Sequence, residues 1–203
     1  MAAKFRKTFT IFFIQKHDGG VSFLRRSRET DILGKIIESG GLAMDKAETY
    51  QYLDSRGIAY EVTEHPAVYS MAQLDQVALP YPADDAKNLF VRDDKKRAYY
   101  LITVRGDKRV DLKAFRRRHG TRPLTFASAE DLAALLKLTP GSVTPLGLLN
   151  DTERRVTWFL DRDFTGRIGV HPNDNTATVW MQAADLADLI RDHGNPVHPA
   201  DME

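Results

Sequence analysis

The chain has 203 residues, a net charge of +1, and ordinary shares of hydrophobic and charged residues, 42% and 28%. This length allows one domain with a full hydrophobic core and hardly two. The chain contains no cysteine, which excludes disulfides, zinc–thiolate sites and thiol nucleophiles and fits a reducing cytoplasm. The apolar stretch at residues 9–14 is far shorter than the roughly 20 residues of a membrane-spanning helix, so no membrane association is predicted.

The first part of the chain differs in character from the rest. Residues 1–43 are weakly patterned, whereas Met44 opens a sequence with clear helix and strand punctuation. We therefore predict an N-terminal extension over residues 1–43 and one domain over residues 44–203. The alternative is that Thr8–Phe13 forms an added strand and Asp31–Ser39 a helix, both packed on the domain.

The first half of the domain is predicted to contain two helices and three strands. Gly57 stops the first helix, and Pro80 and Pro82 prevent the second from continuing. The polar turn Asp93–Lys96 marks a hairpin between the last two strands. In chain order the predicted elements are a helix at Asp45–Ser55, a strand at Ile58–Thr63, a helix at Met71–Val77 capped by Ser70, and strands at Lys87–Arg92 and Arg97–Val104.

The second half is predicted to mix short helices with further hairpins. Asp111 caps one helix, and Ser128 with Asp131 forms a capping box for the next. The elements are a helix at Leu112–His119 ended by Gly120, a strand at Leu124–Phe126, a helix from Ser128 to Leu138, strands at Arg155–Leu160, Ile168–His171 and Thr176–Trp180, and a helix at Ala183–His193. This order predicts a single α+β domain with a mixed, largely antiparallel sheet flanked by helices, rather than a doubly wound parallel sheet.

Several standard sites are missing from the sequence. It has no G-x-G-x-x-G, no phosphate-binding loop ending in G-K-[ST], no H-E-x-x-H and no G-x-S-x-G. Its six histidines show no common metal spacing, so no metal and no cofactor are predicted. The carboxylate pairs Asp84–Asp85 and Asp93–Asp94 fall in turns, where we expect them to be solvated.

One local segment is strongly basic although the whole chain is nearly neutral. In residues 105–122, lysines and arginines greatly outnumber the two acidic residues, Asp107 and Asp111. Within this segment, Arg116, Arg117 and Arg118 are expected on the exposed side of a helix whose inner side holds Leu112 and Phe115. Such a patch suits the docking of a nucleic acid at one defined place. The alternative is a solvated helix face.

Three short motifs follow one another along the domain. They are Lys87-Asn-Leu-Phe, then Gly141-Ser-Val-Thr-Pro145, then Gly169-Val-His-Pro-Asn173. In this order and spacing the chain resembles the YbaK/prolyl-tRNA synthetase-associated editing-domain family, and within it the freestanding prolyl-tRNA editing group. Thr63–Pro66 and Pro145–Asn150 support the resemblance, which covers about Met44 to His193.

The resemblance implies the family's fold, with a curved mixed sheet, and hydrolysis of the ester that joins an amino acid to tRNA. It implies aminoacylated tRNA(Pro) as the partner, with prolyl-tRNA synthetase as a further candidate, in the cytoplasm and without a cofactor. It assigns catalytic roles to Lys87, Gly141 and His171. It assigns substrate binding to Asn88, Ser142, Val143, Thr144 and Pro145, and we expect Arg116, Arg117 and Arg118 to bind the tRNA.

The chemistry of Lys87 fits its assigned role, whereas the position of Asn88 fits less well. A lysine at a strand start, as at Lys87, is expected to bury its stem and aim its ammonium at a cleft, where it would attract phosphates and developing negative charge. Strand alternation points the neighbouring Asn88 to the opposite face. His171 is expected either to orient water or to shape the pocket.

Three functions remain open at the level of the sequence. The first is hydrolysis of mischarged Ala-tRNA(Pro) by direct attack of water, without a covalent intermediate. The second is the same reaction on Cys-tRNA(Pro), which only the size of the pocket distinguishes. The third is a non-catalytic module that binds tRNA or a synthetase, with residues 1–43 as its interaction element.

Overall fold

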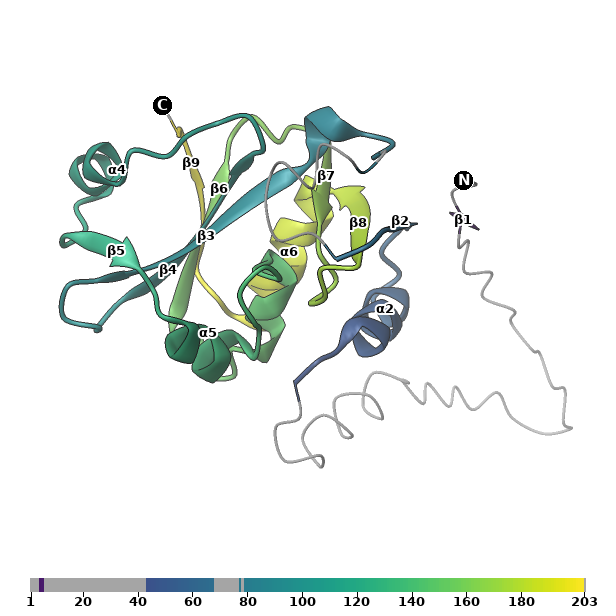
Figure 1. Cartoon of the computed structure of the whole chain (residues 1–203), viewed down its shortest axis with the longest axis horizontal. Coiled ribbons are helices and arrows are strands. Elements are labelled where there is room, and N and C mark those ends of the chain that lie inside the picture. Colours follow the sequence, from purple (N-terminus) through teal and green to yellow (C-terminus); the bar gives the residue numbers. More distant parts are fainter. Residues whose placement is uncertain (1–3, 6–42, 68–76, 78, 203) are drawn as a thin grey trace, which may run out of the picture.

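The computed structural model describes residues 4–5, 43–67, 77 and 79–202 (Figure 1). The strand expected at Thr8–Phe13, the helix at Asp31–Ser39 and nearly all of the helix at Met71–Val77 lie outside these ranges. These three elements, and the division of the chain at Met44, therefore stay predictions. Of the helices in the described part, none is long and apolar enough to cross a bilayer.

The described strands form two sheets. The four-stranded sheet has the order β1-β2-β8-β7 and is antiparallel throughout. The five-stranded sheet has the order β5-β3-β4-β6-β9; it is antiparallel from β5 to β4 and parallel from β4 to β9. The strands are β1 (Lys4–Phe5), β2 (Tyr60–Glu64), β3 (Ala86–Asp93), β4 (Tyr99–Arg105), β5 (Leu124–Phe126), β6 (Val156–Asp161), β7 (Arg167–Val170), β8 (Ala177–Gln182) and β9 (Val197–Ala200).

Helices flank these sheets, as the α+β prediction requires. They are α2 (Lys46–Ser55), α4 (Leu112–His119), α5 (Ala129–Leu136) and α6 (Ala183–His193), with 3₁₀ turns η1 (Pro82–Asp84) and η2 (Pro145–Asn150). The single-domain α+β fold with mixed, mainly antiparallel pairing is therefore confirmed. The sequence did not indicate that the strands divide between two sheets.

Local capping explains why most helix bounds agree with the prediction. Asp111 accepts hydrogen bonds from the backbone at the start of α4, and Gly120 ends that helix with a φ of 63°. Ser128 and Asp131 form the expected capping box of α5. That helix ends at Leu136 rather than Leu138, because Lys137 takes the left-handed conformation with a φ of 56°.

Strand β9 was not predicted. It carries Pro199, which the sheet tolerates because β9 is an edge strand. Its partner β6 runs parallel to it, and β7, β8 and α6 lie between them in the sequence. No hairpin turn in the sequence therefore indicates this pairing.

Two hydrophobic clusters lie on opposite faces of the five-stranded sheet. The main cluster fills the space between this sheet, the four-stranded sheet and α2, α5, α6 and η2; it includes Phe90, Leu101 and Trp158. The second cluster includes Val91, Ile102 and Phe115 and lies under α4. Alternation along β3 and β4 therefore assigns each side chain of these strands to one cluster or the other.

Candidate active site

The two sheets meet where the Lys87 and His171 motifs converge. Asp85, just before β3, forms a parallel bridge with Gly169 of β7. Lys87 and His171 each lie two residues beyond this bridge. Because the two segments run parallel, both residues lie on the same side of the bridge along the chain direction. A Cβ atom on Gly169 would lie 2.2 Å from the ring of Trp180, so glycine is needed there to let β7 pack against that ring. The bridge brings two motifs that are distant in sequence to one edge.

The loop at residues 141–145 is tied directly to His171. The fully buried Thr144 donates from its hydroxyl to the His171 carbonyl oxygen, at 2.7 Å. Ser142 is also buried, and its hydroxyl donates to the carbonyl of Thr139 at 2.9 Å. Both hydroxyls therefore hold the loop in shape, while Val143 packs against the main cluster. Gly141 has a φ of 95°, a conformation that favours glycine, while Pro145 is buried at the start of η2.

The surroundings of His171 favour its neutral form. Its burial lowers the pKa of the imidazole, and the nearby His65 lowers it further, although a hydrogen bond to the Ala177 carbonyl partly opposes this. That bond joins Nδ1 to the carbonyl oxygen at 2.9 Å. Because a carbonyl can only accept, Nδ1 carries the proton in the neutral ring. Nε2 is then a hydrogen-bond acceptor, which can orient a water molecule or receive an N–H group of a substrate.

Lys87 and Asn88 project to opposite faces of β3, as alternation predicted. Asn88 pairs in register with Thr103 and accepts its hydroxyl proton at 2.7 Å, on the face of the main cluster. Lys87 pairs with Val104, which belongs to the second cluster. Asn88 therefore lies on the face of β3 that is turned towards the main cluster, against which Val143 of the loop at residues 141–145 also packs.

The ammonium group of Lys87 is not aimed into an open cleft, contrary to the prediction. It donates to the carbonyl oxygens of Gly106, at 3.4 Å, and Lys108, in the loop that follows β4. The backbone of Asp85 holds the same loop, since its carbonyl accepts from the Gly106 N–H at 3.0 Å. An ammonium has three donors, so Lys87 can fix this loop and still offer one N–H to a ligand.

Asp85 is a residue that reasoning from the sequence missed. It was expected to be solvated in a turn, but burial raises the pKa of its carboxyl group to about 7, while a hydrogen bond from the Ala86 backbone opposes the shift. Asp93 was likewise expected to be solvated and is only 2% exposed. Its carboxylate accepts from the backbone N–H of Lys95 and Arg97, which closes the β3–β4 turn.

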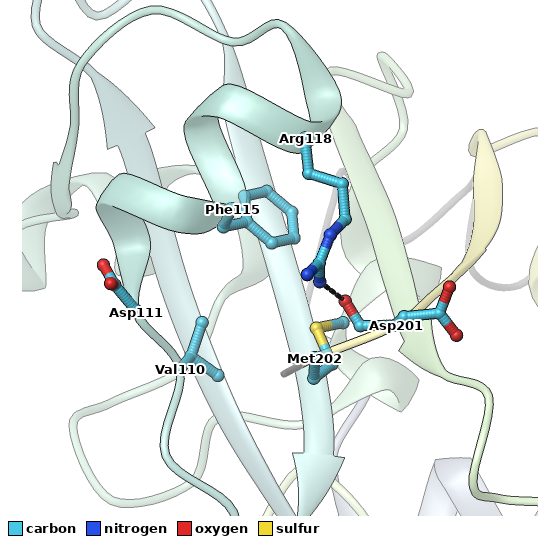
Figure 2. Close-up of a pocket in the computed structure, with 6 residues that line it drawn as sticks. All are labelled: Val110, Asp111, Phe115, Arg118, Asp201 and Met202. Carbon is cyan, nitrogen blue, oxygen red and sulfur yellow. Dashed lines mark hydrogen bonds between the residues drawn. The ribbon is translucent and has the colours of Figure 1, made fainter.

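The arginines expected to bind tRNA lie on α4, apart from this edge (Figure 1). Arg116 and Arg117 are exposed, and within the described ranges neither forms an ion pair. Arg118 reaches across a shallow pocket to the carbonyl of Asp201, as Figure 2 shows. Arg118 therefore holds the C-terminal segment against α4, which the sequence did not indicate.

No group of three or more histidine or carboxylate side chains that could hold a metal ion gathers among the described residues. The site thus consists of a neutral imidazole, an amide, an ammonium and a rigid loop. These groups can bind and orient an ester and a water molecule, but none of them is a nucleophile supported by a base.

Comparison with known proteins gives this arrangement a family. Residues 65–189 match the model of the aminoacyl-tRNA editing domain. Prolyl-tRNA editing protein ProX of Acetoanaerobium sticklandii is 39% identical over 145 residues, which cover 70% of this chain and 88% of that protein. Prolyl-tRNA synthetase associated domain-containing protein 1 of Danio rerio is 33% identical, over 81% of this chain and 93% of that protein.

A solved structure agrees with these sequence matches. A protein described as a candidate trans-editing enzyme for prolyl-tRNA synthetase superposes with a TM-score of 0.59 at 25% identity. The superposition covers 78% of this chain and 96% of the other. The chain therefore belongs to the aminoacyl-tRNA editing domain family.

Proposed function

We propose that this protein is a trans-editing deacylase that hydrolyses mischarged Ala-tRNA(Pro) in the cytoplasm. Water attacks the carbonyl carbon of the aminoacyl ester, the bond from that carbon to the ribose oxygen breaks, and a proton from water ends on the ribose oxygen. The products are free alanine and uncharged tRNA. An ester is activated enough for positioning and electrostatics to supply the catalysis, so no covalent intermediate is required.

One observation carries the proposal: the hydrogen bond from Thr144 to the His171 carbonyl. It joins two of the three motifs into one rigid unit, and that unit presents a neutral imidazole whose Nε2 can accept. In the proposed reaction, Nε2 orients the attacking water or the substrate amine. Gly141 and Val143 shape the pocket for the small side chain, and Lys87 attracts the terminal phosphates.

The need for such an enzyme follows from the limits of selectivity. A synthetase pocket shaped for proline can reject the smaller alanine only by the binding energy of the missing carbons, about 1–3 kcal/mol. A second pocket that admits alanine and excludes proline restores accuracy. Because correctly charged Ala-tRNA(Ala) must be spared, the protein also has to read the tRNA. Arg116 and Arg117 are the proposed contacts, since they are exposed and continue the basic segment that starts at the loop held by Lys87.

Deacylation of a panel of charged tRNAs tests the proposal. Wild-type protein should release alanine from Ala-tRNA(Pro) and leave Pro-tRNA(Pro) and Ala-tRNA(Ala) intact. Lys87→Ala should reduce kcat/KM by about 100-fold, because it removes a charged contact and loosens the 106–108 loop. Lys95→Ala, which changes an exposed lysine in the turn after β3, is the matched control.

The other outcomes of this panel each decide something. Faster release of cysteine than of alanine would move the protein to Cys-tRNA(Pro) editing. Binding of tRNA with no release from any substrate would make it a non-catalytic module. Full activity of Lys87→Ala would refute the role given to Lys87.

A further inference from the structure

A chain of hydrogen bonds runs through the main core to Asn88. The indole Nε1 of Trp158 donates to the Thr103 hydroxyl at 2.8 Å, and that hydroxyl donates to Asn88 Oδ1 at 2.7 Å. Trp158 and Thr103 are fully buried, with 0% of their surface exposed, whereas Asn88 is half-buried. The chain therefore starts in the core and ends at the edge where the motifs meet.

Donor chemistry fixes the direction of every step in this chain. An indole N–H can only donate, so the Thr103 oxygen has to accept from Trp158. The hydroxyl of Thr103 then has its own proton left for Asn88, and only the oxygen of the amide can receive it. If the Asn88 amide were rotated by half a turn, the Thr103 oxygen would accept from both Trp158 and Asn88, and its own buried hydroxyl proton would lose its partner, which costs about 1–3 kcal/mol. The core thus selects one orientation of the amide.

In this orientation the NH₂ group of Asn88 points away from Thr103. Among the described residues, none accepts a hydrogen bond from Asn88 Nδ2. Asn88 lies on the main-cluster face of β3, and Val143 of the loop at residues 141–145 packs against the same cluster. A group that presents N–H donors suits a carbonyl oxygen, on which negative charge grows during ester hydrolysis. It does not suit a protonated substrate amine, which needs an acceptor such as His171 Nε2.

We propose that Asn88 Nδ2 donates to the carbonyl oxygen of the aminoacyl ester, and that Thr103 and Trp158 are positioning residues that fix this donor. The proposal rests on the proposed deacylase function and assigns different parts of the reaction to different residues. Asn88 stabilises the developing oxyanion, while His171 handles the water or the amine. Thr103 and Trp158 act through Asn88 alone.

Steady-state deacylation of Ala-tRNA(Pro) by matched variants tests the positioning role. Thr103→Val keeps the shape of the side chain and removes the hydroxyl, so kcat should fall by about 10–100-fold while KM changes by less than about threefold. Thr103→Ser keeps the hydroxyl and should restore kcat to within about threefold of wild type. Thr157→Val, a half-buried threonine on the other face of β6, is the control and should leave both constants unchanged.

Two further variants test the direction of the amide. Asn88→Asp still accepts from Thr103 but offers an oxygen instead of NH₂ to the substrate, so its kcat should fall at least as far as that of Thr103→Val. Trp158→Phe removes the first donor and should lower kcat less. Hydrogen exchange of the Trp158 indole N–H, measured by NMR, reports the buried bond without any substrate; it should accelerate in Thr103→Val and stay slow in Thr103→Ser.

The outcomes separate this proposal from the proposed function. An active wild type with an unaffected Thr103→Val, or equal losses in Thr103→Val and Thr103→Ser, would overturn the positioning role and leave the deacylase function standing. A wild type that hydrolyses no aminoacyl-tRNA would overturn the deacylase function and the Asn88 role together. In that case, slow indole exchange that depends on the Thr103 hydroxyl would still establish the fixed amide.

Discussion

The two faces of β3 place different chemistry at the same edge of the molecule. On the face of the main cluster, Asn88 is a neutral donor that a buried hydroxyl and a buried indole hold in place. On the opposite face, Lys87 is a cation that binds backbone carbonyls in the loop leading to α4. Under the proposed function, the first face would place a small reacting group accurately, and the second would attract a charged and extended one.

This difference assigns separate tasks to separate surfaces. The loop at residues 141–145 lies with the first face, since its Val143 packs against the main cluster, and this loop is bonded to the backbone of His171. Groups on this face are buried and their hydrogen bonds are directional. The arginines of α4 lie with the second face, where charge is exposed and screened by salt. Substitutions on the first face should therefore change kcat, and those on the second should change affinity and its dependence on salt.

The largest expected effect is on the free energy of unfolding and concerns Asp85, which lies at the junction of the two sheets, just before β3. Its folded pKa of about 7 lies above the usual value of 3.8, so the folded state retains a proton that the unfolded state loses. The contribution of this carboxyl group to stability is fully present below about pH 4 and is lost as the pH rises to about 7. Asp85→Asn cannot titrate and can still accept from the Ala86 backbone. It should be more stable than wild type by roughly 2–4 kcal/mol at pH 8, with little difference at pH 4.

Urea unfolding at several pH values measures this difference. Asp107→Asn, in the exposed part of the adjacent loop, is the matched control for the loss of one negative charge. Equal gains at pH 4 and pH 8 for Asp85→Asn would contradict the burial of an unpaired carboxyl group at this junction.

The next effect tests the first face through Thr144. Thr144→Val removes the donor to the His171 carbonyl but keeps the shape of the side chain, so His171 can shift relative to the loop. We expect kcat for deacylation to fall by about 10–100-fold, because displacements of about 1 Å have effects of this size. Thr144→Ser retains the hydroxyl and should recover most of the activity. A loss that appears mainly in KM would show that Thr144 shapes the binding pocket instead.

Local signals explain which parts of the fold could be predicted. Helix α4 was found to the residue because Asp111 and Gly120 mark its two ends within a few positions. Strand β9 was missed because its parallel pairing with β6 has no local signature. Burial of Asp85 was missed for the same reason, since the bridge to Gly169 comes from a strand far along the chain.

The candidate site shows the same division. The motifs identified Lys87, Asn88 and His171, but not what each side chain contacts. Thr103 could have been found, because the turn after β3 fixes the hairpin register that pairs it with Asn88. The carbonyl partners of Lys87 could not, since they belong to an irregular loop whose path depends on packing.

The smallest expected effect concerns the second face. Arg116→Ala and Arg117→Ala should each weaken tRNA binding a few-fold and leave kcat unchanged. Each lost phosphate contact should also reduce the slope of log affinity against log salt by about 0.7–0.9. Arg191→Ala, an exposed arginine on α6, is the control.

Arg118 allows a sharper version of the same comparison, because its guanidinium is already engaged with the Asp201 carbonyl (Figure 2). Arg118→Ala should lower the free energy of unfolding by about 0.5–1.5 kcal/mol and change the salt slope less than either neighbour does. Filter binding over a range of salt concentrations, together with urea unfolding, separates the two effects. If all three variants changed the salt slope equally and none changed stability, the arginines of α4 would form one continuous tRNA surface. If none changed the slope, the tRNA would have to bind elsewhere, and the charge on this face of the five-stranded sheet would serve solubility alone.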